Sequence, residues 1–207
     1  MDAGSFVLDA QGVRWALDLG MENYTAIESR KMSLWNAAQD SDRWRIFRLG
    51  NLSHNTLVID GQLQLAKGRA TVRSFRDGPD SEAVLDLSPV YTNAAQVIRT
   101  GTLLPGGGYR LTDTLKGLRP GAPVRWGMVT KALPGDARTG ALLLRQAGKQ
   151  LTLTALHDPA TAWKTYETAK PPNEWDSPNP GTVMVGFEAT APDSGELTLS
   201  VRFTPGP

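Results

Sequence analysis

The richest set of chemistry-bearing side chains in this sequence falls in residues 43–57, which hold one of only two histidines. Three arginines, the last of them Arg48, precede His54, which stands just before the strongly β-forming residues 56–60. Side chains at the start of a strand can converge on a cleft or a metal ion, and imidazole can act as a base or a metal ligand. A lone histidine is a weak signal, so a packing histidine bonded to a neighbouring backbone group is the competing interpretation. The other histidine, His157, fits a turn and is given no role.

Asp18 is the second residue that could do chemistry. It lies near the end of residues 13–19, which we expect to form a strand with Asp18 and Ala16 on one face and Trp15 on the other. A carboxylate on a half-buried face needs a partner. That partner is either an arginine or a cation, and the residue pattern leaves both open. Asp2 and Asp9 are weaker candidates, because both fit solvated or turn positions.

Composition excludes several classes of function. The 207 residues include no cysteine, and 22 Lys+Arg stand against 21 Asp+Glu, for a net charge of +1. The sequence therefore has no disulfide, cysteine zinc site or thiol nucleophile, and its charge gives no reason to expect a nucleic-acid or membrane partner. No apolar run reaches the ~18 residues of a membrane span. Phosphate-loop, dinucleotide-binding, nucleophile-elbow and zinc-protease motifs are missing.

The elements that must position these residues are predicted to be strands. Many segments alternate apolar and polar residues with period 2, the pattern of an antiparallel sheet with one buried face. Two hairpins are expected, one from residues 5–10 and 13–19 and one from residues 56–60 and 63–66. The other predicted strands are 70–76, 83–87, 96–104, 109–116, 124–131, 141–146, 150–156, 183–189 and 196–203.

Glycine and proline mark the turns between these strands. The chain has 21 Gly and 14 Pro residues, and clusters of them lie at 104–108, 119–121, 133–136 and 178–181, each with typical turn chemistry. The only helical turn is expected between residues 27 and 38, and residues 171–181 are expected to form an irregular loop. These features predict an all-β fold: one antiparallel β-sandwich of the super-sandwich type, with about a dozen strands over residues 1–207.

Two blocks of the sequence resemble a known family. Residues 2–6 (DAGSF), 14–16 (RWA), 18–20 (DLG) and Tyr24 form the first, and residues 54–62 (HNTLVIDGQ) form the second. In order and spacing they resemble the start of the C-terminal sheet domain of heparinase II/III-like polysaccharide lyases. The blocks cover about the first third of the chain, and the remainder agrees as a strand-rich tail.

The resemblance implies a function for the intact protein. In that family a helical toroid packs against the sandwich, and β-elimination cleaves uronic-acid-containing glycans between them, with the base supplied by the toroid. The chain begins within a strand-like segment and shows no signal peptide, so we expect the C-terminal fragment of a two-domain lyase, inactive alone. The resemblance also implies a bacterial protein that is periplasmic or exported. The alternative is a stand-alone carbohydrate-binding or structural sandwich.

The resemblance also assigns site residues. It implies a zinc or other divalent-cation site built from Asp18, His54 and a histidine of an Asn-His-x-His-like segment that would precede Met1. Binding by this chain alone is therefore expected to be weak or absent. Arg48 is a possible substrate contact, with a salt bridge as the alternative. We expect an uncovered face for docking the toroid, formed by Trp35, Trp44, Phe47 and the arginines at 43, 45 and 48.

Overall fold

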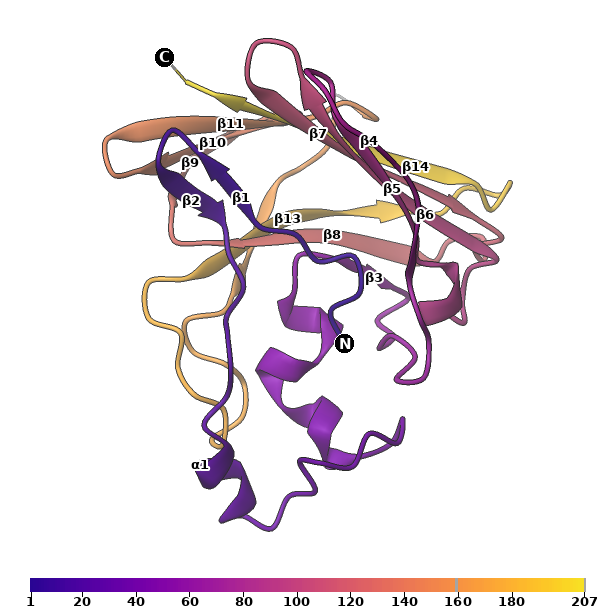
Figure 1. Ribbon diagram of the computed structural model, residues 1–207, viewed down its shortest axis with the longest axis vertical. Coiled ribbons are helices and arrows are strands. Elements are labelled where there is room, and N and C mark those ends of the chain that lie inside the picture. The colour runs from indigo at the N-terminus through magenta and orange to yellow at the C-terminus, as the bar shows by residue number, and fades with distance from the viewer. Residues whose placement is uncertain (159, 207) are drawn as a thin grey trace.

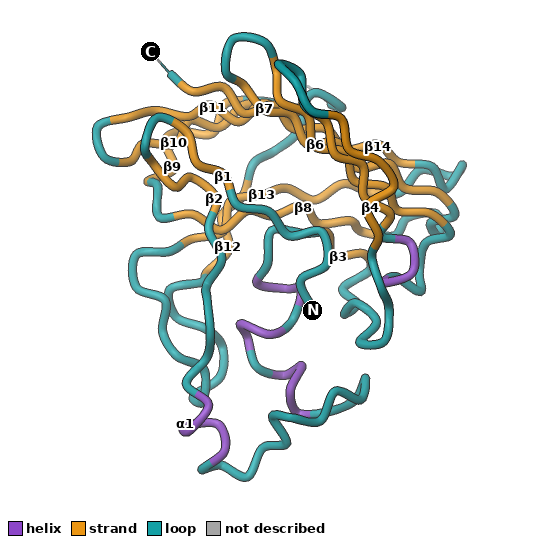
Figure 2. Tube along the Cα trace, in the orientation of Figure 1, coloured by secondary structure: helices purple, strands orange, loops and turns teal. Residues whose placement is uncertain are grey.

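The structure is a computed structural model that describes residues 1–158 and 160–206, and it is a sandwich of antiparallel sheets (Figures 1 and 2). An eight-stranded sheet has the order β4-β5-β6-β7-β14-β11-β10-β9, a four-stranded sheet has the order β12-β13-β8-β3, and β1 pairs with β2. The strands are β1 (Leu8–Ala10), β2 (Val13–Ala16), β3 (Leu57–Ile59), β4 (Thr71–Arg76), β5 (Glu82–Asp86), β6 (Gln96–Leu104), β7 (Gly108–Lys116), β8 (Pro123–Thr130), β9 (Leu133–Arg138), β10 (Ala141–Gln146), β11 (Lys149–Ala155), β12 (Lys164–Glu167), β13 (Val183–Thr190) and β14 (Leu197–Pro205).

Little of the described chain is helical. The α-helix α1 spans Tyr24–Glu28, and short 3₁₀ turns cover Asp42–Arg45, Phe47–Leu49, Asn51–Ser53 and Ser88–Val90. The first three of these turns and α1 belong to a segment that extends below the two larger sheets in Figure 1. None of the helices in the described part of the chain has the length and apolar character that a membrane span requires.

The core lies between the two larger sheets and follows from the period-2 patterns. In β14, Leu199, Val201 and Phe203 are buried, whereas Thr198 and Arg202 on the other face are exposed. The Trp126 ring of β8, in the four-stranded sheet, lies against Phe203 of β14, with ring centroids 6.2 Å apart. The predicted sandwich is thus confirmed, because apolar side chains of both sheets meet in one core.

A buried ion pair joins this core to the N-terminal segment. Arg99 of β6 donates two hydrogen bonds to Asp113 of β7, with N···O distances of 2.7 and 2.9 Å. Its third nitrogen, Nη1, donates to the carbonyls of Gly4 and Asn55. Arg99 therefore fixes the chain on either side of the predicted functional residues against the eight-stranded sheet.

Several local predictions were wrong. The hairpin of residues 56–60 and 63–66 does not form, because β3 pairs with β8 and the backbone N–H of Gln64 donates to the Asn51 side chain. The strand predicted over residues 13–19 ends at Ala16, and Trp15 and Ala16 are both buried. The helical turn predicted between residues 27 and 38 is displaced: α1 spans Tyr24–Glu28, where Asn23 caps it, and residues 29–38 contain no helix. The 3₁₀ turns were not predicted.

Two strands were missed. Residues 133–136 were predicted as a turn but belong to β9, and β12 was not predicted. Both strands lie at sheet edges, where proline is tolerated and the hydrophobic pattern is weak. The irregular loop predicted at residues 171–181 is confirmed.

Candidate functional site

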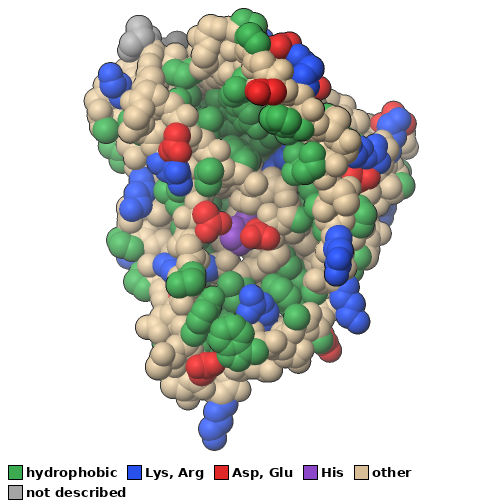
Figure 3. All heavy atoms as spheres, in the orientation of Figure 1, with side chains coloured by type: hydrophobic (Ala, Val, Ile, Leu, Met, Phe, Trp, Pro, Cys, Tyr) green, Lys and Arg blue, Asp and Glu red, His purple; other side chains and the backbone are tan. Residues whose placement is uncertain are grey.

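A cavity of about 520 Å³ lies among segments that come before and after β3 in the chain. Its lining comes from several parts of the chain and includes Asp2, Asp18, Tyr24, Arg48 and His54. Figure 3 shows a hollow on this face with a histidine ring between acidic side chains. The sequence-predicted site residues therefore share one cavity wall.

The structure brings Asp18 and His54 together. The distance from Asp18 Oδ2 to His54 Nδ1 is 3.1 Å. His54 is nearly buried, with 8% of its side chain exposed, whereas Asp18 is 45% exposed. Asp18 lies two residues beyond β2, and its Oδ1 accepts the backbone N–H of Gly20 at 2.7 Å, which turns Oδ2 toward the ring.

The second ring nitrogen of His54 also faces an acceptor. His54 Nε2 lies 2.9 Å from the carbonyl oxygen of Arg48. A carbonyl and a carboxylate oxygen both accept, so a ring with protons on both nitrogens can donate to Asp18 and to Arg48, whereas a neutral ring can donate to only one of them. A cation bound to Nδ1 would replace the proton there and leave an Nε2–H that donates to Arg48.

The pair fits part of a zinc site. Two ligand atoms bound to one tetrahedral zinc ion are about 3.3 Å apart, given bonds of ~2.0 Å, which matches the observed 3.1 Å. Among the described residues, no group of three His, Cys, Asp or Glu side chains could hold a metal ion. Asp18 and His54 thus provide two donors of suitable chemistry, and any further ligand would come from elsewhere.

Two buried amides place this pair, and the sequence analysis did not single them out. Asn55 donates to the carbonyls of Phe6 and Leu17 at 2.7 and 3.0 Å and accepts the backbone N–H of Val129 at 2.6 Å. Gln64 bonds to the N–H and the carbonyl of Ala3. Together they hold the segments on both sides of the cavity. The signal available in the sequence was an asparagine directly between a candidate ligand and a strongly β-forming segment.

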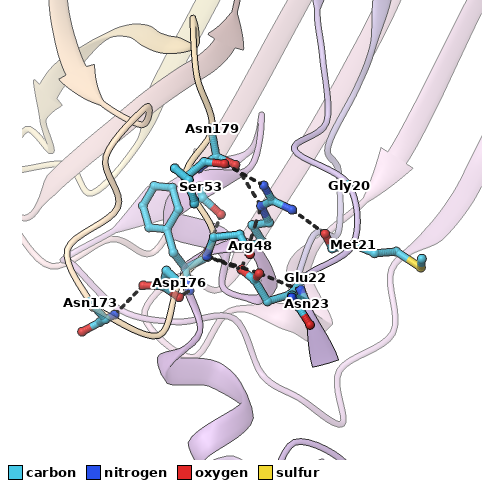
Figure 4. Close-up of polar contacts among 12 residues, drawn as sticks. Gly20, Met21, Glu22, Asn23, Arg48, Ser53, Asn173, Asp176 and Asn179 are labelled. Carbon is cyan, nitrogen blue, oxygen red and sulfur yellow. Dashed lines mark hydrogen bonds and ion pairs between the residues drawn. The ribbon is translucent and has the colours of Figure 1, made fainter. Parts of the chain in front are cut away.

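Arg48 makes its polar contacts mainly with two loops (Figure 4). Its Nε donates to Asn179 Oδ1 at 2.8 Å and lies 3.9 Å from Glu22 Oε2. Its other nitrogens donate to the carbonyls of Met21 and Pro178. The salt bridge considered for Arg48 is therefore present, while its side chain also lines the cavity. The predicted substrate contact stays a prediction.

The aromatic residues assigned to the uncovered face differ in their exposure. Trp35 is 67% exposed and packs edge-on against Tyr24, with ring centroids 5.3 Å apart. Trp44 and Phe47 are half-buried, as are Arg43 and Arg48, and Arg45 is exposed. Of the three aromatic residues assigned to the uncovered face, only Trp35 is largely exposed.

Comparisons with known proteins agree with the fold. The family model described as "Heparinase II/III-like, C-terminal" matches residues 1–193. The crystal structure of heparan sulfate lyase HepC from Pedobacter heparinus superimposes with a TM-score of 0.73 and 15% identity, covering 99% of this chain and 30% of that one. A crystal structure of heparinase III gives a TM-score of 0.72, 14% identity and coverage of 99% and 29%. No curated protein sequence matches significantly. The chain thus spans about 30% of the length of these solved structures.

Proposed function

Because the chain belongs to the heparinase II/III-like family, whose C-terminal domain it matches, we propose that it forms the sheet-domain side of a polysaccharide lyase active site. The intact enzyme would cleave uronic-acid-containing glycans by β-elimination. A helical toroid of the same protein would complete the cavity. The observation that carries the proposal is the placement of His54 Nδ1 against the Asp18 carboxylate, 3.1 Å apart, in the cavity wall.

The residues of this chain would act by holding and orienting. Asp18 and His54 would hold a zinc or other divalent cation, which when bound supplies a fixed positive charge at the cavity wall. The carbonyl of Arg48 would keep the proton of His54 on Nε2. The guanidinium of Arg48, on the same wall, would attract the carboxylates of the glycan. Tyr24 is the tyrosine of this chain that lines the cavity, whereas Tyr91 is buried in the core.

The base that removes the C5 proton of the uronic acid would come from the toroid. General-base catalysis needs a group within hydrogen-bond reach of that proton, and positioning the sugar needs walls on both sides. A bacterial protein with this activity would be periplasmic or exported, in keeping with the family resemblance.

The test compares the 207-residue chain with a longer protein that also carries the helical domain. Absorbance of the 4,5-unsaturated uronide product should rise only with the longer protein, and His54→Ala in that protein should lower the rate at least ~10-fold. Turnover by the chain alone would place the base within it, with Tyr24 the first residue to replace. Glycan binding by the chain alone, with no turnover by the longer protein, would support a carbohydrate-binding module instead.

A further inference from the structure

We propose that three buried polar residues, Glu22, Asp176 and Asn179, position the ring of His54 by holding the backbone of Arg48. We call these three residues the support cluster. They come from the segment before α1 and from the loop between β12 and β13, and Figure 4 shows them around Arg48. That His54 binds a cation rests on the proposed function. That its ring is held in this orientation does not.

His54 depends on the position of one carbonyl. The Arg48 oxygen, 2.9 Å from Nε2, is the acceptor for an Nε2–H. The same residue belongs to the 3₁₀ turn Phe47–Leu49, so any movement of that turn moves the acceptor. Hydrogen-bond partners of this kind set the tautomer and orientation of a ligating imidazole.

Side chains of the loop between β12 and β13 hold the backbone of this turn. Asp176 Oδ1 accepts the N–H of Phe47 at 2.8 Å, and Asp176 Oδ2 accepts from the Asn173 side chain at 2.8 Å. Asn173 also donates to the carbonyl of Arg45 at 3.3 Å. Contacts on both sides of residue 46 therefore link the turn to a loop that is about 130 residues away in the sequence.

The same loop holds the turn by the Arg48 side chain. Asn179 accepts from Arg48 Nε at 2.8 Å while donating to the carbonyl of Thr168 at 2.8 Å. Glu22 has a side chain with no exposed surface; it accepts the N–H groups of Ser177 at 3.2 Å and Asn23 at 2.7 Å and lies 3.9 Å from Arg48. A buried carboxylate is stable only with such partners, so Glu22, Arg48 and the loop are fixed relative to one another.

Nuclear magnetic resonance of ¹⁵N-histidine tests the inference, because the chain has only two histidines. In the metal-free wild type, at a pH where the ring carries both protons, the Nε2–H of His54 should exchange slowly with water, because it is bonded to the Arg48 carbonyl. Asn179→Ala, which removes the acceptor for Arg48, should raise that exchange rate several-fold. In the longer protein it should weaken zinc binding about 10–100-fold. Asn179→Asp, which keeps the acceptor oxygen, should preserve the wild-type exchange rate.

Two controls separate positioning from general stability. His157 contacts the backbone of Ser200, away from the support cluster, so its signals should not change in any variant. Leu153→Ala, a truncation in the fully buried part of β11, should lower the melting temperature and leave the exchange of the His54 Nε2–H unchanged. A folded Asn179→Ala protein whose Nε2–H exchanges as slowly as in the wild type would overturn the inference. A slowly exchanging Nε2–H in the wild type, without zinc binding in the longer protein, would refute the proposed metal role and leave the positioning role supported.

Discussion

Glu22 and Arg48 form the buried charge pair nearest the cavity. The Glu22 carboxylate is fully buried, and Arg48, with 14% of its side chain exposed, is its one cationic partner among the residues described. Removing one member of a buried pair leaves the other charge uncompensated. We therefore expect Arg48→Ala to lower the free energy of unfolding by about 3 kcal/mol, measured by urea denaturation.

A double variant tests whether the loss of stability comes from the unpaired buried charge. Glu22→Gln combined with Arg48→Ala should recover part of the loss, because no unpaired charge then stays buried. If Arg48→Ala instead abolishes the activity of the longer enzyme while its melting temperature is unchanged, Arg48 faces the substrate and the structural account is wrong.

The sequence predicted individual residues of the cavity but not the buried residues of the support cluster. Asp18 and His54 were identified through blocks of sequence that resemble a family, and the 3.1 Å contact brings them together. Glu22, Asp176 and Asn179 follow no local pattern, because their partners lie up to 155 residues away. Only the tertiary fold shows that these polar side chains are buried and paired.

Strand β3 shows how an element is held beside the cavity. The Tyr91 hydroxyl donates to the carbonyl of Leu57 at 2.9 Å and accepts from Gln64 at 3.0 Å. Burial raises the pKa of the Tyr91 phenol, so the folded chain keeps this proton to higher pH than the unfolded chain. The stabilisation is therefore fully present below the unfolded value of about 10 and is lost as pH rises toward the folded value.

Tyr91→Phe should accordingly have two effects. At pH 7 the free energy of unfolding should fall by about 1–2 kcal/mol, because buried partners lose their hydrogen bonds. Above pH ~10 the free energy of unfolding of Tyr91→Phe should fall less steeply with pH than that of the wild type. Urea denaturation at a series of pH values measures both. Leu153→Ala should lower stability without changing the slope, and an unchanged slope in Tyr91→Phe would contradict the argument.

Regular alternation made most strands predictable. The bounds predicted for β6 and β10 agree with the structure, and β14 was predicted to within two residues. Residues 63–66 alternate in the same way but form no strand, because Leu65 bonds to the carbonyl of Val90 and Gln64 turns inward to Ala3 and Tyr91. Periodicity reports which faces are apolar and does not report which partner a segment finds.

At the scale of the whole molecule, the candidate site has fewer ligands than a metal needs. Asp18 and His54 offer two donors, and the described residues contain no group of three. Catalytic zinc sites take three protein ligands and structural sites take four. The cavity is lined by residues outside the two larger sheets, and the chain spans about 30% of the length of the lyase structure compared above. The resemblance implies that a preceding histidine supplies the next ligand.

We therefore expect the metal content to depend on the length of the protein. The 207-residue chain should purify with little zinc, because two ligands bind weakly, whereas a longer protein that includes the preceding histidine segment should retain about one ion per molecule. Elemental analysis of both proteins measures this. In the longer protein, Asp18→Asn should lower the zinc content with little change in melting temperature, because Asp18 is 45% exposed. Stoichiometric zinc in the short chain, surviving both Asp18→Asn and His54→Gln, would show that the ion binds elsewhere and that the ligand assignment is wrong.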